Sequence, residues 1–385
     1  MSSPGAGDRA HEVVLFGASG FTGALTAHYL ARTAPSDFRW ALAGRNREKL
    51  EQLRAELASE NSALADMPVL LADVTDPDSL RRVAAAARVV LTTVGPYIRY
   101  GEPLVAACAE EGTDYCDLTG EPEFVDQMYL RHDTRARETG ARLVHCCGFD
   151  SIPSDLGAYF TVKQLPEGVP IRLEGFLRVR ARPSGGTVSS GLAAVTRFPQ
   201  LVRAGRRRRR VEPPAEGRTV RRSPGHPRYE RAVGAWVVPL PVIDLEIVRR
   251  SARALPRYGP DFSYRHYVAV YLSSSVGMAR AIGKTMVHGL PKPGEGPTPE
   301  QRAESWFKLR FVGEGGGSRV VTEVAGGDPG YGETSKMLGE AGMCLARDDV
   351  PERAGQLTTA VAMGDALIAR LERAGIAFNV LETNP

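Results

Sequence analysis

Cysteine is scarce in this chain, and long hydrophobic runs are missing. Five cysteines stand among 385 residues, with no Cys-x-x-Cys pair and no Cys/His spacing of a zinc site. Such a set argues against a disulfide framework and against a metal centre. No stretch approaches the roughly 18 uncharged apolar residues of a membrane-spanning helix. No apolar signal segment is recognisable near the N-terminus either, so we expect a cytoplasmic protein without a transmembrane segment.

Lysine is the other scarce residue, because 43 of the 49 basic residues are arginine. The composition, 43% hydrophobic and 24% charged, is that of a globular protein long enough for two domains. The net charge of +4 is unevenly spread. Segment 197–232 holds twelve arginines against three glutamates, a local charge of +9, which leaves −5 for the rest of the chain.

Strands and helices alternate along the first 150 residues. Short apolar strands are predicted at 12–16, 39–43, 68–71, 88–94, 114–118 and 142–147, and helices at 21–32, 47–59, 77–86, 101–111 and 121–139. This order predicts an α/β fold with a doubly wound, parallel Rossmann sheet. Ligands bind such sheets outside the carboxyl ends of the strands, so the residues that follow each strand are candidates for a binding site.

The first strand is followed by a glycine-rich turn, Gly17-Ala18-Ser19-Gly20-Phe21-Thr22-Gly23. Glycine allows a tight turn and lets backbone N–H groups approach a pyrophosphate at the N-terminus of the next helix. The spacing is GxxGxxG rather than GxGxxG, but its place between a strand and a helix predicts a dinucleotide site. Cofactor contacts are assigned to Gly17, Ser19, Gly20, Phe21 and Thr22. A turn without a ligand is the alternative.

The second strand end indicates which dinucleotide is bound. An NAD enzyme usually carries an acidic residue there to accept hydrogen bonds from the ribose hydroxyls. Here the strand ends at Gly44 and Arg45, and Glu48 is already inside the next helix. Because Arg45 can pair with a 2′-phosphate, the sequence favours NADP(H) over NAD(H). An arginine solvated at the helix start is the alternative.

Two further strand ends complete the predicted cofactor site. Asp73 and Val74 follow the third strand, where an acidic residue and a small apolar one suit the adenine edge. Asp73 could instead cap the next helix. Thr93, Gly95 and Pro96 follow the fourth strand and are predicted to pass under the nicotinamide ribose.

Polar residues after these strands are candidates for chemistry. Tyr97 follows the fourth strand and would project near the reacting carbon, although an aromatic packed under a loop is the alternative. The fifth strand runs into Asp117 and Glu121. The last runs into Asp150 and Ser151, which are predicted to face a cleft. Helix capping is the alternative for these last residues.

Nine motifs resemble the saccharopine dehydrogenase-like oxidoreductases, and more closely their trans-acting enoyl reductase subgroup. They are GASGFTG at 17–23, VGPY at 94–97, GE at 120–121, GFDSIP at 148–153, SGGT at 184–187, YGPDF at 258–262, KPGEGP at 292–297, WFKLRF at 306–311 and GDPGYGET at 327–334. The resemblance runs from about residue 12 to about residue 381. It departs at the arginine-rich segment 206–222, which matches no motif of the family.

The resemblance implies an enzyme that uses NADPH to reduce the α,β-double bond of an acyl thioester held by a polyketide synthase. Such a reaction needs a hydrogen-bond donor to the enolate oxygen and a proton for the α-carbon. Tyr97 is the predicted donor, and Ser151 is the second candidate. Asp150 is expected to orient partners, because a carboxylic acid donates at neutral pH only with a strongly raised pKa. Cys116 and His145 are predicted to be packing residues.

Two other functions stay open on the sequence. The chain could be a saccharopine-type dehydrogenase acting on an amino-acid-derived imine, which would need basic clamps for two carboxylates in the second domain. It could also be a cofactor-binding scaffold without catalysis. An oligomer is compatible with either reading.

The predicted domain organisation has four parts: a disordered lead-in at 1–10, an NADP-binding domain at 11–150, an α+β substrate domain at 151–345, and a helical segment at 346–385 that returns to the first domain. Strands at 172–179, 264–272, 305–311 and 318–325, the last two joined by glycines at 313–317, predict an antiparallel sheet. Asp349 and Gly375 mark the expected limits of the C-terminal helix.

Five consecutive arginines stand at 206–210. Like charges repel and cannot fill one helix face, which predicts a mobile basic loop near 203–230. A solvated insertion without specific function is the simplest interpretation. A docking patch for an acidic acyl carrier protein is another. Nucleic-acid binding lacks a supporting fold motif, so no nucleic-acid partner is expected.

Overall fold

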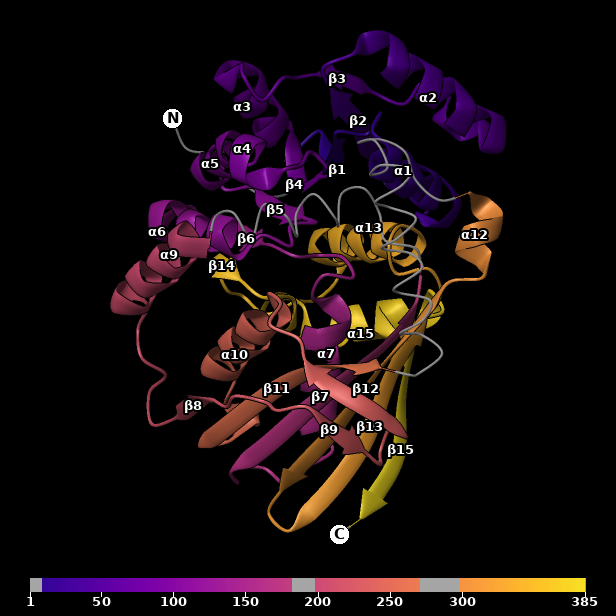
Figure 1. Ribbon diagram of the computed structural model, residues 1–385. Coiled ribbons are helices and arrows are strands. Elements are labelled where there is room, and N and C mark those ends of the chain that lie inside the picture. Colours follow the sequence, from indigo (N-terminus) through magenta and orange to yellow (C-terminus); the bar gives the residue numbers. More distant parts are fainter. Residues whose placement is uncertain (1–8, 182–197, 271–297, 385) are drawn as a thin grey trace. The chain divides into compact units, whose positions relative to one another are not determined.

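The computed structural model describes residues 9–181, 198–270 and 298–384 (Figure 1). The chain forms two compact units, and the first division between them falls after Asp150. Within the described ranges, no helix combines the length and the apolar character that crossing a bilayer requires. The motifs at 184–187 and 292–297, and residues 1–8 of the expected lead-in, lie outside the described residues.

The first unit is built on a seven-stranded parallel sheet. Its order is β14 (Gly355–Leu357), β6 (Arg142–Val144), β5 (Asp114–Asp117), β4 (Ala87–Thr92), β1 (His11–Phe16), β2 (Trp40–Gly44) and β3 (Val69–Leu71). All five residues of β2 are buried, as expected for a strand covered on both faces. The prediction of an α/β fold with a parallel Rossmann sheet is confirmed, and β14 extends the sheet by one strand drawn from far along the chain.

Helices cover both faces of this sheet. The helices of the first unit are α1 (Phe21–Thr33), α2 (Arg47–Glu60), α3 (Pro77–Ala86), α4 (Tyr97–Tyr100), α5 (Glu102–Glu111), α6 (Pro122–Thr139), α9 (Phe198–Val211), α13 (Gly332–Arg347), α14 (Thr359–Ala362) and most of α15 (Gly364–Arg373). Helices α3, α5 and α6 pack in a row, α9 lies against α6, and α13 lies against α1 (Figure 1). The side chains of Asn46 and Asp76 cap the N-termini of α2 and α3, because each accepts hydrogen bonds from backbone N–H groups of the first turn.

The second unit is built on an eight-stranded mixed sheet. Its order is β15 (Ala377–Asn384), β13 (Ser318–Gly326), β12 (Trp306–Gly315), β7 (Ile171–Arg180), β11 (Asp261–Val270), β10 (Ala235–Pro239) and β9 (Arg228–Glu230), with β8 (Thr219–Arg222) beside β11. Helices α7 (Ile152–Val162) and α10 (Asp244–Ala254) pack together and against its strands. A short helix, α12 (Pro299–Ala303), precedes β12.

The predicted antiparallel sheet is only partly right. Strands β12 and β13 form the expected hairpin around Gly316 and Gly317, both with positive φ. However, β7 pairs in parallel with β11, and β8 also pairs in parallel with β11. A long connection that contains the arginine-rich segment separates β7 from β11. The residue pattern within either strand therefore could not show whether the two strands pair in parallel or antiparallel.

The chain ends differ from the expected organisation as well. Arg9, within the expected lead-in, is buried, and its guanidinium donates to the carbonyls of Ala84 and Glu111. At the other end, 346–385 is not wholly helical. Gly375, at φ +88, turns the chain after α15, and β15 then pairs with β13 in the second unit. The domain boundary predicted at residue 345 is therefore not observed. The chain enters the first unit before this residue and returns to the second unit after it.

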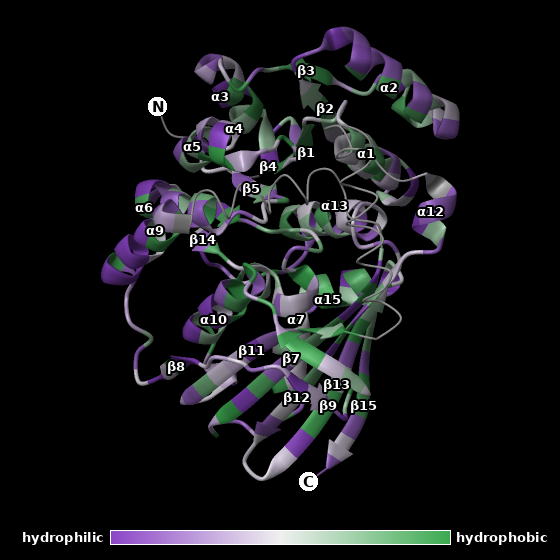
Figure 2. Ribbon diagram, in the orientation of Figure 1, coloured by the Kyte–Doolittle hydropathy of each residue, from purple (hydrophilic) through white to green (hydrophobic). Residues whose placement is uncertain are grey.

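Residues 206–210 lie in helix α9, which replaces the predicted loop. Arginine is a good helix former, and successive residues of a helix point about 100° apart, so five arginines do not share one face. Arg208 is turned inward, where it pairs with Asp126 and Glu212. The strongly hydrophilic residues of the helix are concentrated in its second half, which holds the consecutive arginines (Figure 2). Asp126 and Glu212 thus compensate the charge of Arg208, one of the five arginines, while the helix turns the others to different sides.

Candidate functional site

The glycine-rich turn after β1 has no room for side chains at two of its positions. Gly17 adopts φ +83, and a Cβ there would lie 2.5 Å from Cγ2 of Val94. A Cβ at Gly23 would lie 2.2 Å from the carbonyl oxygen of Gly17. Helix α1 follows at Phe21, with no side-chain cap at Gly20 and no acidic residue in its first turn. The N-terminus of α1 is thus open to an anion such as a pyrophosphate.

The end of β4 is tied to this turn. The hydroxyl of Thr93 donates to the carbonyl oxygen of Gly17 at 3.1 Å. Gly95 and Pro96 follow, exposed, and are joined by a cis peptide bond. Among the other predicted contacts, Phe21 packs edge-on against Tyr331, with the ring centroids 4.7 Å apart. The structure therefore brings the turn and the fourth strand end together, as the sequence predicts.

Arg45 and Asp73 stand at the ends of the neighbouring strands β2 and β3. Arg45 is exposed. Asp73 accepts from the backbone N–H and the hydroxyl of Thr75, so it forms a local turn rather than a helix cap. These hydrogen bonds lower the pKa of Asp73, and the positive charge of Arg45 lowers it further. Val74 is half-buried and packs against the core.

These strand ends fit a dinucleotide that carries a 2′-phosphate. At Gly17 and Gly23 there is no space for a side chain, so only backbone atoms would lie beside a pyrophosphate. The N-terminus of α1 would bind this pyrophosphate. Arg45 presents an exposed guanidinium where the 2′-phosphate of NADP(H) would lie. Glu48, in contrast, is part of α2 and does not replace an acidic residue at the strand end.

Tyr97 does not have the environment predicted for a hydrogen-bond donor to the enolate oxygen of a substrate. The residue is buried at 6% exposure. Its hydroxyl donates to the carbonyl oxygen of Thr92 at 3.0 Å and accepts the N–H of Leu118 at 3.1 Å. Burial raises the pKa of this phenol well above its usual range. Its one hydrogen is already used, so the hydroxyl joins the ends of β4 and β5 and is not presented to a ligand.

Glu121 holds the backbone beside Tyr97. Its two carboxylate oxygens accept the N–H groups of Tyr97 and Ile98, each at 2.9 Å. These bonds lower its pKa, but burial is the stronger effect and raises the pKa overall. Glu121 thus fixes the entry into α4 from the end of β5.

Asp117 is the centre of a buried network that the sequence did not reveal. Its Oδ2 lies 2.6 Å from Nδ1 of His145 and accepts the hydroxyl of Tyr115 at 3.0 Å. Its Oδ1 accepts the N–H groups of Thr119 and Cys146, each at 3.0 Å. Cys146 adopts φ +63, a conformation that non-glycine residues rarely take. The network fixes the ends of β5 and β6, so His145 is more than a packing residue.

Asp150 follows this network and is exposed to solvent. It lies against Gly120, where an added Cβ would be 2.9 Å from its Oδ1. Part of the residue reaches solvent, but burial of its carboxyl group among protein atoms is the largest cause of a raised pKa, and the negative charges of Asp117 and Glu121 add to it, so that the pKa is about 6. A carboxyl group of this pKa can hold and release a proton near neutral pH. This property was not expected from the sequence.

Ser151 belongs to the second unit, where it stands at the N-cap of α7. It is fully buried, and its hydroxyl makes no hydrogen bond within the described part of the chain. The predicted side-chain cap is therefore not formed. The described residues contain no group of three or more His, Cys, Asp or Glu side chains arranged to hold a metal ion.

Comparisons with known proteins agree with this geometry. Residues 13–144 match the saccharopine dehydrogenase NADP binding domain, which confirms the prediction of NADP(H) as the cofactor. The chain is 37% identical to a trans-acting enoyl reductase of Mycobacterium ulcerans, over 96% of this chain and 97% of that protein. It is 36% identical to a trans-acting enoyl reductase of Mycobacterium tuberculosis, with the same coverage.

Among solved structures, saccharopine dehydrogenase from Saccharomyces cerevisiae matches with a TM-score of 0.57 at 12% identity, over 97% of this chain and 99% of that one. At this identity the likeness concerns the fold. It agrees with the parallel sheet of the first unit and the mixed sheet of the second.

Proposed function

We propose, since the chain belongs to the family of trans-acting enoyl reductases, that it reduces the α,β-double bond of an acyl thioester with NADPH. The observation that carries this proposal is the 37% identity to a trans-acting enoyl reductase over 96% of this chain, and Asp150, whose pKa is raised to about 6, is the residue proposed to supply the proton. A reductase of this kind must supply a proton as well as a hydride. An imine-reducing enzyme and a non-catalytic scaffold have no comparable support among the described residues.

The residues of the first unit have separate roles in this reaction. When bound, NADPH supplies the hydride that reaches the β-carbon of the substrate. The turn at Gly17, the N-terminus of α1 and Arg45 bind the phosphates. Thr93 holds the turn against β4 through its bond to Gly17. Together these residues orient the cofactor along the edge of the sheet.

Asp150 is the proposed proton donor, in place of Tyr97. The α-carbon of the reduced thioester must take up one proton, and the carboxyl of Asp150 can give it and recover it from solvent. With a pKa of about 6, roughly one-tenth of the carboxyl is protonated at pH 7. Asp117 keeps that pKa high through its negative charge. Ser151 stays a candidate for a hydrogen bond to the enolate oxygen, because its buried hydroxyl has no partner among the described residues.

The substrate is proposed to arrive as a thioester on the acyl carrier domain of a polyketide synthase. The name of the relatives, trans-acting enoyl reductase, supports a substrate held by another protein. We also propose the cytoplasm as the site of action. Five cysteines without disulfides support a reducing compartment.

The test is reduction of a defined enoyl thioester. The purified chain is given a crotonyl thioester and NADPH deuterated at the transferred position, and the product is analysed by mass spectrometry. We expect one deuterium at the β-carbon and one solvent proton at the α-carbon. The saturated thioester serves as the control and should cause no NADPH oxidation. Turnover of an amino-acid-derived imine, with no turnover of enoyl thioesters, would overturn the proposal.

A further inference from the structure

Helix α9 has an anchored face and an exposed face. On the anchored face, Arg208 is 4% exposed and donates to Oε1 of Gln356 at 2.6 Å. It pairs with Asp126 at 3.4 Å, and its guanidinium stacks 4.0 Å above the ring of Tyr129. A buried arginine with this many partners fixes the rotation of the helix about its own axis. The other face is therefore presented in a defined direction.

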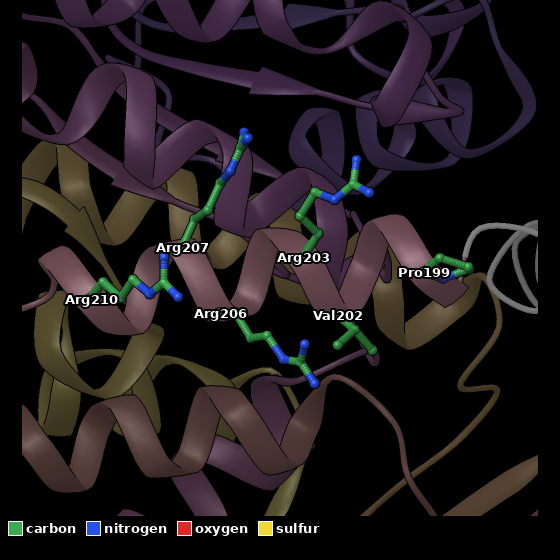
Figure 3. Close-up of a pocket in the computed structure, with 6 residues that line it drawn as sticks. All are labelled: Pro199, Val202, Arg203, Arg206, Arg207 and Arg210. Carbon is green, nitrogen blue, oxygen red and sulfur yellow. The ribbon is translucent and has the colours of Figure 1, made fainter.

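The exposed face carries four arginines in a stripe. Arg203, Arg206, Arg207 and Arg210 follow the spacing i, i+3, i+4 and i+7, which places them along one side of two helical turns, about 10 Å long. All four are exposed. With Pro199 and Val202 they line an open hollow of about 620 Å³ (Figure 3). We call these four residues the arginine stripe.

The arginine stripe carries unneutralised charge. Within the described ranges, none of its four guanidinium groups forms an ion pair or a hydrogen bond, and no carboxylate lines the hollow. Some other exposed arginines of the same unit do have acidic partners, such as Arg81 with Asp78 and Arg135 with Glu110. The stripe lies in the segment of charge +9, whereas the rest of the chain carries −5. Its charge thus differs in sign from the net charge of the rest of the chain.

We propose that the arginine stripe is the docking surface for an acidic helix of the acyl carrier domain that delivers the substrate. This inference rests on the proposed function, in which the thioester is held by another protein. Charge complementarity is the argument for the occupant. Four guanidinium groups in a row match carboxylates repeated along a helix of similar length, and apolar atoms of Pro199 and Val202 lie at one end of the row.

Because α9 is anchored, the arginine stripe can fix the orientation of a bound partner as well as attract it by charge. Because Arg208 holds the helix against α6, the stripe keeps its geometry before a partner binds, and little ordering cost is added on docking. A solvated basic segment without an anchored face would attract acidic proteins, but it would not fix their orientation. The inward Arg208 is therefore left intact in every variant of the test.

The experiment measures binding without turnover. A purified, fluorescently labelled acyl carrier domain of a polyketide synthase is titrated with the full chain at low salt. The variant R206Q/R207Q/R210Q removes stripe charges while keeping a good helix former. Its control is R209Q, which removes an exposed arginine from the same helix but outside the stripe. We expect Kd to rise at least about tenfold for the triple variant, with a flatter salt dependence, and about twofold or less for R209Q.

A second pair of variants guards against loss of folding. R207E and R209E each reverse one charge on α9, and only R207E should weaken carrier binding, by about tenfold. For both, kcat on a small crotonyl thioester should match the wild type, because that substrate does not need docking. If no enoyl thioester is reduced but carrier binding depends on the stripe, the docking inference stands and the proposed reaction fails.

Two results would overturn the docking inference. One is equal affinity of the wild type, R206Q/R207Q/R210Q and R207E for the carrier domain. The other is that the stripe binds duplex DNA, or vesicles of anionic phospholipid, more tightly than the carrier domain at the same salt. That second result would assign the stripe to a different class of partner.

Discussion

Nδ1 of His145 lies 2.6 Å from Oδ2 of Asp117, and this contact joins the ends of β5 and β6 inside the first unit. The same carboxylate accepts from Tyr115 and from two backbone N–H groups, so its oxygens are fully used. Its negative charge also raises the pKa of Asp150. A buried structural network and a carboxyl group of raised pKa are thus coupled through one residue.

The first prediction concerns the stability that this network provides. Asp117→Asn replaces a carboxylate oxygen with an NH₂ group, which cannot accept from Tyr115 and His145. A buried donor is then left without an acceptor, and the free energy of unfolding should fall by about 2–4 kcal/mol. Urea denaturation measures it. Asp78→Asn, at an exposed ion pair with Arg81, is the control and should change stability by about 0.5 kcal/mol or less.

The second prediction concerns the pH dependence of turnover. If protonated Asp150 gives the proton, its active form is present below its pKa of about 6 and disappears as the pH rises through that value. The rate of the chemical step should therefore decrease above about pH 6. Asp150→Asn should abolish this decrease and lower kcat by roughly 10²–10⁴. Steady-state rates with a crotonyl thioester between pH 5 and 8 measure both effects.

Asp117→Asn provides a third prediction, on the position of that decrease. Removing the negative charge of Asp117 removes one cause of the raised pKa of Asp150. Less of the carboxyl is then protonated at a given pH, so the decrease should begin at a lower pH than in the wild type. The comparison is made at a temperature where both proteins are folded. A pH profile unchanged by Asp117→Asn and by Asp150→Asn would contradict the assignment of Asp150.

The fourth prediction concerns the choice of cofactor. Arg45 is exposed after β2, and a charged contact with the 2′-phosphate is typically worth about 1.5–3 kcal/mol. NADPH should therefore bind at least about tenfold more tightly than NADH, as fluorescence titration can measure. Arg45→Glu should remove this preference. Arg47→Glu, an exposed position in α2, is the control and should keep it. Equal affinity of the wild-type chain for both cofactors would contradict the role of Arg45.

The sequence predicts the first sheet well because its signals are local. Most of the strands are short apolar runs, and two of the helices that follow them have their own caps, Asn46 before α2 and Asp76 before α3. The glycine turn is local at Gly23, where a side chain would meet the backbone of Gly17, whereas at Gly17 a side chain would meet Val94 from the end of another strand. The pairing of β7 with β11 is different, because it joins residues about 90 positions apart and no local pattern specifies its direction.

In the candidate site, too, some features follow from local sequence, whereas others depend on contacts between residues far apart in the chain. The phosphate turn and Arg45 can be found from residue type and position alone. The Asp117 network cannot, because it depends on His145 reaching back from the next strand. Arg208 is a further case: five consecutive arginines predict repulsion, and only the position of Asp126 on α6 shows that one of them is buried and paired.

The last prediction concerns Tyr97, whose hydroxyl is held between β4 and β5. Tyr97→Phe keeps the ring against Phe124 but leaves the N–H of Leu118 without its acceptor. The free energy of unfolding should fall by about 1–3 kcal/mol, measured by urea denaturation. On a crotonyl thioester, kcat should stay within about threefold of the wild type, because the hydroxyl hydrogen already belongs to the carbonyl of Thr92.

Tyr100→Phe is the matched control for this change. Tyr100 is 41% exposed, so losing its hydroxyl should alter stability by about 0.5 kcal/mol or less. A loss of roughly 10²–10³ in kcat for Tyr97→Phe, with stability unchanged, is the size expected for removing a preorganised donor. That outcome would mean that the hydroxyl leaves Thr92 to reach the substrate. Tyr97 would then share the proton chemistry assigned to Asp150, and the buried contacts between β4 and β5 would describe only the resting arrangement.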